Sequence, residues 1–307
     1  MSLSAILFPG QGAQKVGMGQ ALAEASPVCR NVFDQANEIL GRDLAATCFE
    51  GPQEELTRSL NAQPAIFAVS VAAYRLLREK KPGVAFDLAA GLSSGEWTAL
   101  HLAGVLSFED TVRVLDARGR FMQEACEAAP GGMVSVIGLD HDALLRICEA
   151  AGVNMANLNS RQQTVLSGGK DAVVAAAKLA SEAGAKRAIP LPVAGAFHSP
   201  LMQPAADRMR GFLAEITFSA PACPVVANVT GRPHGAPDEI RAAMVEQIVG
   251  SVHWYEGIEF MQSEGVGTYV ECGPGKVLTG LVKRIDKGAT LVNIHEPTTL
   301  EAVPAGL

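Results

Sequence analysis

The amino-acid sequence predicts an α/β fold in which a large subdomain with a parallel sheet is interrupted by a small inserted subdomain. Short apolar strands alternate with amphipathic helices over most of the chain, which is typical of a parallel sheet covered by helices on both faces. Near the middle, the order of predicted elements changes to βαββαβ, which is the order of a ferredoxin-like unit. These two observations together predict the architecture.

The first elements predict a buried strand and its covering helices. An apolar strand over residues 4–8 ends in a glycine-rich loop over residues 9–14. Helices are predicted over residues 18–40 and 52–79, because their apolar residues recur at helical spacing. A second buried strand is predicted over residues 84–90, and we expect it to lie beside the first.

The motif Gly91-Leu92-Ser93-Ser94-Gly95-Glu96 follows this second strand and has the GxSxG pattern. A strand, a tight corner between glycines and a helix are the context in which GxSxG forms a nucleophile elbow. Ser93 is therefore the predicted nucleophile. The pattern alone also fits a strand-to-helix turn with a capping serine, so the motif leaves both interpretations open.

The ferredoxin-like unit is predicted after a further amphipathic helix over residues 108–127. Gly131-Gly132 and Ala194-Gly195 supply flexible boundaries around the unit. Its predicted elements are a strand over 133–139, a helix over 141–151, strands over 153–158 and 164–167, a helix over 172–183 and a strand over 187–193.

The alternation of helices and strands resumes after the inserted unit. The sequence predicts helices over 202–216, 237–249, 255–263 and 277–285, with strands over 225–227, 268–271 and 291–294. Residues 297–307 are predicted to be a loose tail. The large, hydrolase-like α/β subdomain is thus discontinuous: it is predicted to comprise residues 1–128 and 198–307, and the ferredoxin-like subdomain residues 129–197.

Composition excludes several classes of protein. The chain of 307 residues is 48% hydrophobic and 19% charged, which is enough for a substantial core. Its net charge of −7 and lack of a dense basic tract argue against binding to nucleic acid. No apolar run of about 18 residues is present to cross a membrane. The six cysteines lack the spacing of a metal site or a disulfide framework, and with no recognisable signal peptide we expect a cytoplasmic location.

A serine nucleophile needs a base, and the chain offers six histidines. His198 is the first choice, because it lies in the loop that joins the inserted unit to the large subdomain, where a cleft is expected. His295 is the rival, because a hydrolase with the order Ser, acid, His would place its base there, although only the adjacent Glu296 could serve as its acid. We expect His101 and His141 at the surface. His234 is expected to be solvated.

Backbone N–H groups should stabilise the charge that develops on oxygen during acyl transfer. Ser94, the residue after the nucleophile, normally supplies one donor. Gln11 could supply the second, because neighbouring parallel strands end at the same sheet edge. The glycine-rich loop around Gln11 also fits a phosphate-binding loop, but the chain lacks the pattern GxxxxGK[ST].

Beyond these features, the chain resembles the malonyl-CoA:acyl carrier protein transacylases and the related acyltransferases of polyketide synthases, including trans-acting ones. The resemblance covers almost the whole length, and its motifs fall in the family's order. They are Phe8-Pro9-Gly10-Gln11-Gly12-Ala13-Gln14, Gly91 to Glu96, Arg118-Gly119-Arg120-Phe121-Met122-Gln123, Asn157-Leu158-Asn159-Ser160, Gly195-Ala196-Phe197-His198-Ser199-Pro200-Leu201-Met202 and Glu271 to Gly280.

The resemblance implies a role for each residue of the site. Ser93 would be the nucleophile and His198 its base, and Arg118 would bind the free carboxylate of malonyl through its planar guanidinium. Gln11 and Ser94 would supply the oxyanion donors. The backbone carbonyl of Gln247 would hold the His198 ring, and Asn159 would be a supporting partner. The implied substrates are malonyl-CoA and the phosphopantetheine thiol of an acyl carrier protein, with no bound cofactor and no metal, in fatty acid or polyketide biosynthesis.

Two residues bear on acyl selectivity. The family usually has histidine before the elbow serine, whereas this chain has Leu92. Phe197 is the residue that malonyl-selective members of the polyketide group tend to carry, and its bulk leaves little room for an α-methyl branch. The alternative function is therefore an acyl hydrolase, or an acyltransferase of a trans-acting polyketide synthase with altered selectivity.

A basic patch is expected where the acidic carrier protein docks. Its predicted members are Lys186, Arg187, Lys276, Lys283 and Arg284.

Overall fold

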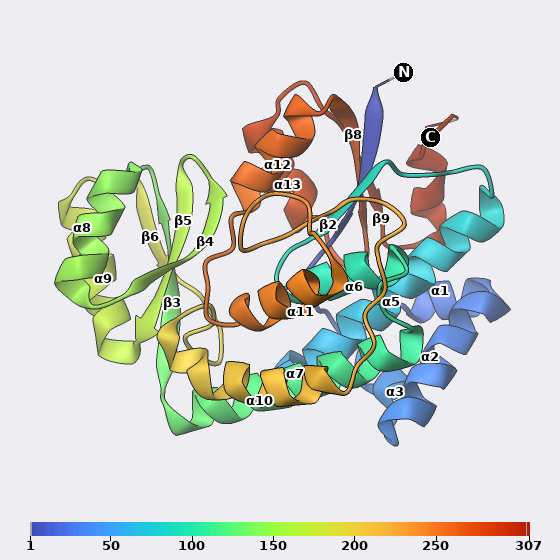
Figure 1. The fold of residues 1–307 in the computed structure, drawn as a ribbon, viewed down its shortest axis with the longest axis horizontal. Coiled ribbons are helices and arrows are strands. Elements are labelled where there is room, and N and C mark those ends of the chain that lie inside the picture. Colours follow the sequence, from blue (N-terminus) through green and yellow to red (C-terminus); the bar gives the residue numbers. More distant parts are fainter. Residues whose placement is uncertain (1, 305) are drawn as a thin grey trace.

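A five-stranded parallel sheet forms the centre of the large subdomain in the computed structural model, which describes residues 2–304 and 306–307 (Figure 1). Its strand order is β7-β2-β1-β8-β9. The strands are β1 (Leu3–Phe8), β2 (Leu88–Gly91), β7 (Val225–Val226), β8 (Val266–Cys272) and β9 (Thr290–Ile294). In the register of β1 and β2, Phe8 pairs with Gly91, so the loop after β1 and the corner after β2 leave the sheet side by side.

A four-stranded antiparallel sheet forms the small subdomain, in the order β4-β5-β3-β6. Its elements are β3 (Gly131–Ile137), α8 (His141–Ala151), β4 (Asn154–Ser160), β5 (Gln163–Gly169), α9 (Lys170–Glu182) and β6 (Arg187–Pro190). This strand order is that of a ferredoxin-like unit, and Figure 1 shows it as a separate lobe in green and yellow. The predicted fold class is thus confirmed, while the limits 129–197 stay a prediction.

The remaining helices belong to the large subdomain. They are α1 (Gln20–Ala25), α2 (Pro27–Leu40), α3 (Leu44–Phe49), α4 (Gln53–Thr57), α5 (Ser59–Lys80), α6 (Ser94–Leu102), α7 (Phe108–Ala128), α10 (Gln203–Ala214), α11 (Pro237–Glu246), α12 (Trp254–Ser263) and α13 (Val277–Ile285), with the 3-10 helices η1 (Pro200–Met202) and η2 (Pro297–Ala302). Of these, α5, α6, α12 and α13 pack directly on the sheet.

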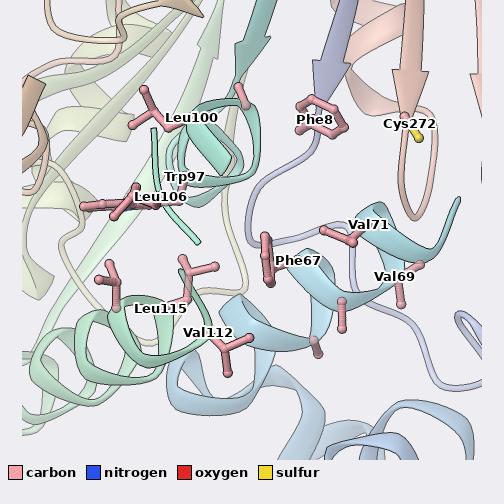
Figure 2. Packing of buried hydrophobic residues seen from close by; sticks show 14 of the residues in the cluster. Phe8, Phe67, Val69, Val71, Trp97, Leu100, Leu106, Val112, Leu115 and Cys272 are labelled. Carbon is pink, nitrogen blue, oxygen red and sulfur yellow. The ribbon is translucent and has the colours of Figure 1, made fainter. Parts of the chain in front are cut away.

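Alternate residues of β1 divide the core into two layers, because side chains of a strand point to opposite faces. Ile6 and Phe8 belong to the cluster shared with α5, α6 and α7, part of which Figure 2 shows around Phe67 and Trp97. Ala5 and Leu7 belong to the cluster shared with α12 and α13 on the other face. The sheet is therefore buried on both faces, as near-continuous apolar strands predict.

Several predicted helix boundaries were wrong for local reasons. The helix predicted over 18–40 is two helices, because Ser26 is extended, accepts a hydrogen bond from the Val28 N–H and precedes Pro27. The helix predicted over 52–79 is likewise divided, at Arg58. The strand predicted over 84–90 is limited to Leu88–Gly91.

The C-terminal segment is also ordered differently from the prediction of a loose tail. It begins with η2, and Leu300 and Val303 are buried, with 6% and 2% of their surface exposed. Both belong to the core cluster that contains α1, α2 and α5. Burial of these two apolar side chains holds the segment against the large subdomain.

Of the helices in the described part of the chain, none has the length and apolar character needed to cross a membrane.

Candidate active site

The corner after β2 holds Ser93 in a strained backbone conformation, with φ 54° and ψ −111°. A non-glycine residue at positive φ costs of the order of 1–3 kcal/mol and tends to occur at functional sites. The glycines on either side permit the turn: a Cβ on Gly91 would lie 2.0 Å from the Gly95 backbone, and a Cβ on Gly95 would lie 2.2 Å from the Phe8 carbonyl oxygen. This is the geometry of a nucleophile elbow.

Asn228 fixes the elbow from the neighbouring strand, and sequence analysis did not identify it. Its Oδ1 accepts a hydrogen bond from the Ser93 N–H at 2.7 Å, and its Nδ2 donates to the Gly91 carbonyl at 2.7 Å. Asn228 follows β7, which pairs with β2, so it lies beside the elbow although 135 residues separate it from Ser93. Only the strand order, which the sequence does not reveal, brings the two together.

His198 lies next to the hydroxyl of Ser93. Its Nε2 is 2.8 Å from Ser93 Oγ, and its Nδ1 is 2.8 Å from the backbone carbonyl oxygen of Gln247. A carbonyl only accepts, so Nδ1 carries the proton and Nε2 is left as an acceptor for the Ser93 O–H. The arrangement is a serine–histidine dyad that a carbonyl orients, without an acid on the ring.

The imidazole of His198 is held in its neutral form. Only 4% of the residue is exposed, and this burial, together with the positive charge of Arg118, lowers the pKa of His198 from 6.5 to about 4. Hydrogen bonds to backbone carbonyls oppose the shift but do not cancel it. A neutral imidazole at physiological pH is ready to accept a proton from Ser93.

Arg118, on α7, places a buried cation beside the nucleophile. The residue is 1% exposed, and its guanidinium donates to Gln63 Oε1 at 2.8 Å, to Gln247 Oε1 at 2.9 Å and to Ser93 Oγ at 3.2 Å. Burial lowers the pKa of Arg118 to about 10, so the group still carries its charge at neutral pH. No carboxylate of a described residue contacts it, and its Nε has no hydrogen-bond partner among these residues.

The two predicted oxyanion donors lie together. The Gln11 N–H donates to Ser94 Oγ at 3.2 Å, which is a long and readily replaced hydrogen bond. Ser94 is the first residue of α6, so its own N–H has no acceptor within the helix. Gln11 follows β1 and Ser94 follows β2, and the parallel pairing of these strands explains why the two residues meet.

A cavity of about 390 Å³ opens over Ser93, Arg118 and His198. Leu92 and Phe197 line it, and both contribute apolar surface. Strands β3, β4 and β5 of the small subdomain also contribute side chains, so the cavity lies between the two subdomains. Of the predicted residues, Asn159 lines the cavity, but its buried Oδ1 makes no hydrogen bond to any described residue.

Two expectations about the other histidines were wrong. The side chain of His234 is only 2% exposed rather than solvated, and its Nε2 lies 2.7 Å from Glu96 Oε1. His101 is only partly exposed rather than fully at the surface: it packs edge-on against Phe67 and Phe108, and burial lowers its pKa. The contact that buries His234 comes from Glu96, 138 residues away, whereas His101 contacts Phe108 and the Leu106 carbonyl from its own part of the chain.

Two further histidines, His141 and His295, lie in different places. His141 is exposed, as expected, at the first turn of α8. His295, the rival base, follows β9, which β1 and β8 separate from β2 in the sheet. With neighbouring strands about 4.8 Å apart, three strand spacings place it far from Ser93. It is not among the residues that line the cavity.

Four of the five predicted basic residues lie together in a second cavity, of about 640 Å³, between the subdomains. They are Lys186, Arg187, Lys283 and Arg284; Arg161 and Lys287 join them, and Glu259 is the one acidic residue of the lining. Lys276 is exposed but does not line this cavity. Gln163 lines both cavities, so the basic cavity adjoins the one over Ser93.

The described part of the chain contains neither a disulfide bond nor a cluster of side chains suited to bind a metal ion. No group of three His, Cys, Asp or Glu side chains is placed to hold a metal ion there. All six cysteines are free thiols. Burial raises the pKa of Cys29, Cys126 and Cys148 to about 11, so these thiols are poorly reactive at neutral pH.

Comparison with known proteins identifies close relatives over the full length. A family model described as an acyl transferase domain matches residues 6–294. The malonyl CoA-acyl carrier protein transacylase of Escherichia coli (strain K12) is 44% identical over 306 residues, covering 98% of this chain and 99% of that protein.

Two solved structures have the same fold. That of the malonyl CoA-acyl carrier protein transacylase from Coxiella burnetii matches with a TM-score of 0.94 and 39% identity, covering 98% of this chain and 96% of that one. The other is a malonyl-transacylase in complex with a type II PKS acyl-carrier protein. It matches with a TM-score of 0.94 and 42% identity, covering 98% of each chain.

Proposed function

The chain belongs to the acyl transferase domain family, and from this premise we propose how its site transfers a malonyl group from malonyl-CoA to the phosphopantetheine thiol of an acyl carrier protein. The protein is an acyltransferase of the malonyl CoA-acyl carrier protein transacylase class, which serves fatty acid and polyketide biosynthesis. One observation carries the assignment of the substrate: Arg118 is a buried cation, free of contact with any described carboxylate, and it lies 3.2 Å from Ser93 Oγ.

Malonyl fits this arrangement because it has a carboxylate at one end and a thioester at the other. A buried guanidinium favours a carboxylate strongly, since its parallel N–H groups match the two oxygens and little water competes. With the carboxylate on Arg118, the thioester carbonyl lies within reach of Ser93. An uncharged acetyl group would leave the guanidinium without its partner.

The first half of the reaction forms an acyl-enzyme. His198 Nε2 takes the proton of Ser93 Oγ, and Oγ attacks the thioester carbon. The N–H groups of Gln11 and Ser94 would then stabilise the negative oxygen of the tetrahedral intermediate. The C–S bond breaks, the CoA sulfur takes the proton from His198, and malonyl remains as an ester on Ser93.

The second half regenerates the enzyme. The thiol of the carrier protein's phosphopantetheine arm gives its proton to His198, and its sulfur attacks the ester carbon. The C–O bond breaks, and Ser93 Oγ takes the proton back from His198. Protons and bonds balance over the two halves with the residues of the chain alone, so the proposal needs neither a bound cofactor nor a metal.

The basic cavity supports a docking place for the carrier protein. Its excess of lysine and arginine complements an acidic partner, and Gln163 connects it to the cavity over Ser93. A carrier held there would direct its flexible arm toward the acyl-enzyme. We also propose a cytoplasmic location, which the six free cysteines support because reducing compartments keep thiols unpaired.

A transfer assay tests this function. The purified chain is incubated with malonyl-CoA and a holo-acyl carrier protein, and both malonyl-carrier and free malonate are measured. We expect malonyl-carrier as the main product. Without the carrier protein, we expect only slow hydrolysis of malonyl-CoA to free malonate. Free acid as the main product, or faster use of acetyl than of malonyl thioesters, would instead support the alternative of an acyl hydrolase.

A further inference from the structure

The carboxylate of Glu96 lies at the centre of a buried hydrogen-bond network beside the nucleophile elbow. Its Oε1 is 2.7 Å from His234 Nε2, and its Oε2 accepts from Gln247 Nε2 at 2.5 Å. The Asn228 N–H reaches both oxygens at 3.2 Å. The side chains of Glu96 and His234 are 1% and 2% exposed, and none of the reaction steps above uses either.

Two of the groups that donate to Glu96 also contact the reacting residues. Gln247 donates from the same Nε2 to the Ser93 carbonyl at 3.0 Å, and its Oε1 accepts from Arg118 at 2.9 Å. Asn228 uses its side chain to hold the Ser93 N–H. A change at the Glu96 carboxylate would therefore reach both the nucleophile and the guanidinium.

The Glu96 carboxylate, together with the Ser93 carbonyl, determines which way the Gln247 amide points. A carboxylate only accepts hydrogen bonds, so the amide must turn its NH₂ group toward Glu96. The amide oxygen is then left on the side of Arg118, where it accepts from the guanidinium. If the amide were reversed, its NH₂ group would face the guanidinium donors and its oxygen would face the carboxylate, and both contacts would be lost.

We propose that Glu96 and His234 form a positioning pair, which sets the direction of the Gln247 amide and thereby holds the Arg118 guanidinium in place for the carboxylate of malonyl. This inference rests on the proposed function, because it concerns recognition of the malonyl group. His234 contributes an N–H donor that fixes the plane of the Glu96 carboxylate. Neither residue lines the cavity over Ser93, so both act through other residues, chiefly Gln247.

The charge of Glu96 has a second effect on the same guanidinium. Arg118 is buried without a described acid in contact, and burial disfavours its charged form. The negative charge of Glu96 opposes this by raising the pKa of Arg118. Glu96 is therefore close enough to support the cation, yet it leaves the guanidinium free for a substrate carboxylate.

Three variants test the pair: Glu96→Gln, which removes the charge; His234→Leu, which removes the donor; and His234→Gln, which keeps an N–H donor at a similar distance. The readout is the ratio of kcat/KM for malonyl-CoA to kcat/KM for acetyl-CoA. Loss of the Gln247 contact to Arg118 should lower this ratio about tenfold in the first two variants. The third should recover most of the loss.

This ratio separates a positioning role from a structural one. Partial unfolding lowers the amount of active enzyme equally for both substrates, so it leaves the ratio unchanged even in a poorly stable variant. A matched control is His253→Leu. His253 forms a similar pair with Glu256, Nδ1 to Oε2 at 2.5 Å, but it is partly exposed and does not line the cavity over Ser93.

The decisive comparison is between Glu96→Gln alone and Glu96→Gln combined with Arg118→Ala. If the pair acts through the guanidinium, Glu96→Gln should no longer change the ratio once Arg118 is absent. An unchanged ratio in Glu96→Gln and His234→Leu, or an equal effect with and without Arg118, would overturn the inference. Failure of the unmodified protein to transfer malonyl would instead overturn the proposed function, so the two failures are distinguishable.

Discussion

The Nδ1 atom of His198 lies 2.8 Å from the backbone carbonyl oxygen of Gln247, so a peptide group takes the place that an acid has in a catalytic triad. A carbonyl orients the ring and fixes its tautomer, but it supplies no full negative charge. Burial and the nearby Arg118 therefore dominate, and they lower the pKa of His198 to about 4. The base stays neutral well below neutral pH.

The pH dependence of acyl transfer should reflect this low pKa. Between pH 8 and 5.5 we expect kcat/KM for malonyl-CoA to stay nearly constant, because His198 remains unprotonated over this range. A base with the ordinary pKa of 6.5 would lose about tenfold in activity at pH 5.5. Single-turnover acylation rates measure the profile, with circular dichroism as the control for folding. An inflection near pH 6.5 would contradict the environment assigned to His198.

Arg118→Ala should lower kcat/KM for malonyl-CoA by about 100-fold or more, because two charge-assisted hydrogen bonds in a buried site are lost. The same change should spare transfer of acetyl, which makes no such bonds. Arg118→Lys is the matched variant: it keeps the charge but not the planar fork, so an intermediate loss is expected. An equal loss for malonyl and acetyl would remove Arg118 from substrate recognition.

Phe197→Ala should widen the range of acyl groups, because the phenyl ring lines the cavity over Ser93. We expect kcat/KM for methylmalonyl-CoA relative to malonyl-CoA to rise about tenfold, because space for one methyl group changes discrimination by about this factor. Competition between the two donors measures this ratio. Phe218→Ala is the control, because Phe218 is equally buried, at 7% exposed, but lies outside the cavity. If both variants shift the ratio alike, the effect is not local.

Charge reversal in the basic cavity should weaken binding of the carrier protein. Lys283→Glu is expected to raise KM for the carrier about tenfold at low salt, with little effect on acylation by malonyl-CoA. Lys178→Glu is the control, because Lys178 is exposed on α9 and does not line the cavity. Binding of the carrier that is insensitive both to Lys283→Glu and to added salt would show that it docks elsewhere.

The features that the sequence could predict are mostly local ones. The elbow at Ser93 depends on glycines within two residues of it, and the βαββαβ order of the small subdomain follows from the periodicity of successive segments. The roles assigned to Arg118 and Gln247 came from the resemblance alone, because an arginine on a helix is more often a solvated residue. No pattern near either one predicts its burial.

The features that the sequence could not predict depend on distant contacts. His234 follows a turn, and its local sequence predicts a solvated side chain. The β-bridge between Val226 and Pro233 instead places it beside Glu96, which is 138 residues away in the sequence. Asn228 reaches Ser93 only because β7 pairs with β2. Leu300 and Val303 find their apolar partners in helices from the other end of the chain, so their burial is invisible in the local sequence.

In the proposed mechanism malonyl passes through an ester on Ser93, and the mass of the intact protein after mixing with malonyl-CoA reveals whether that ester forms. We expect one malonyl adduct per chain, mapped to Ser93, absent from Ser93→Ala and discharged when holo-acyl carrier protein is added. Transfer of malonyl by Ser93→Ala at the rate of the unmodified protein, or an adduct on another residue, would contradict it.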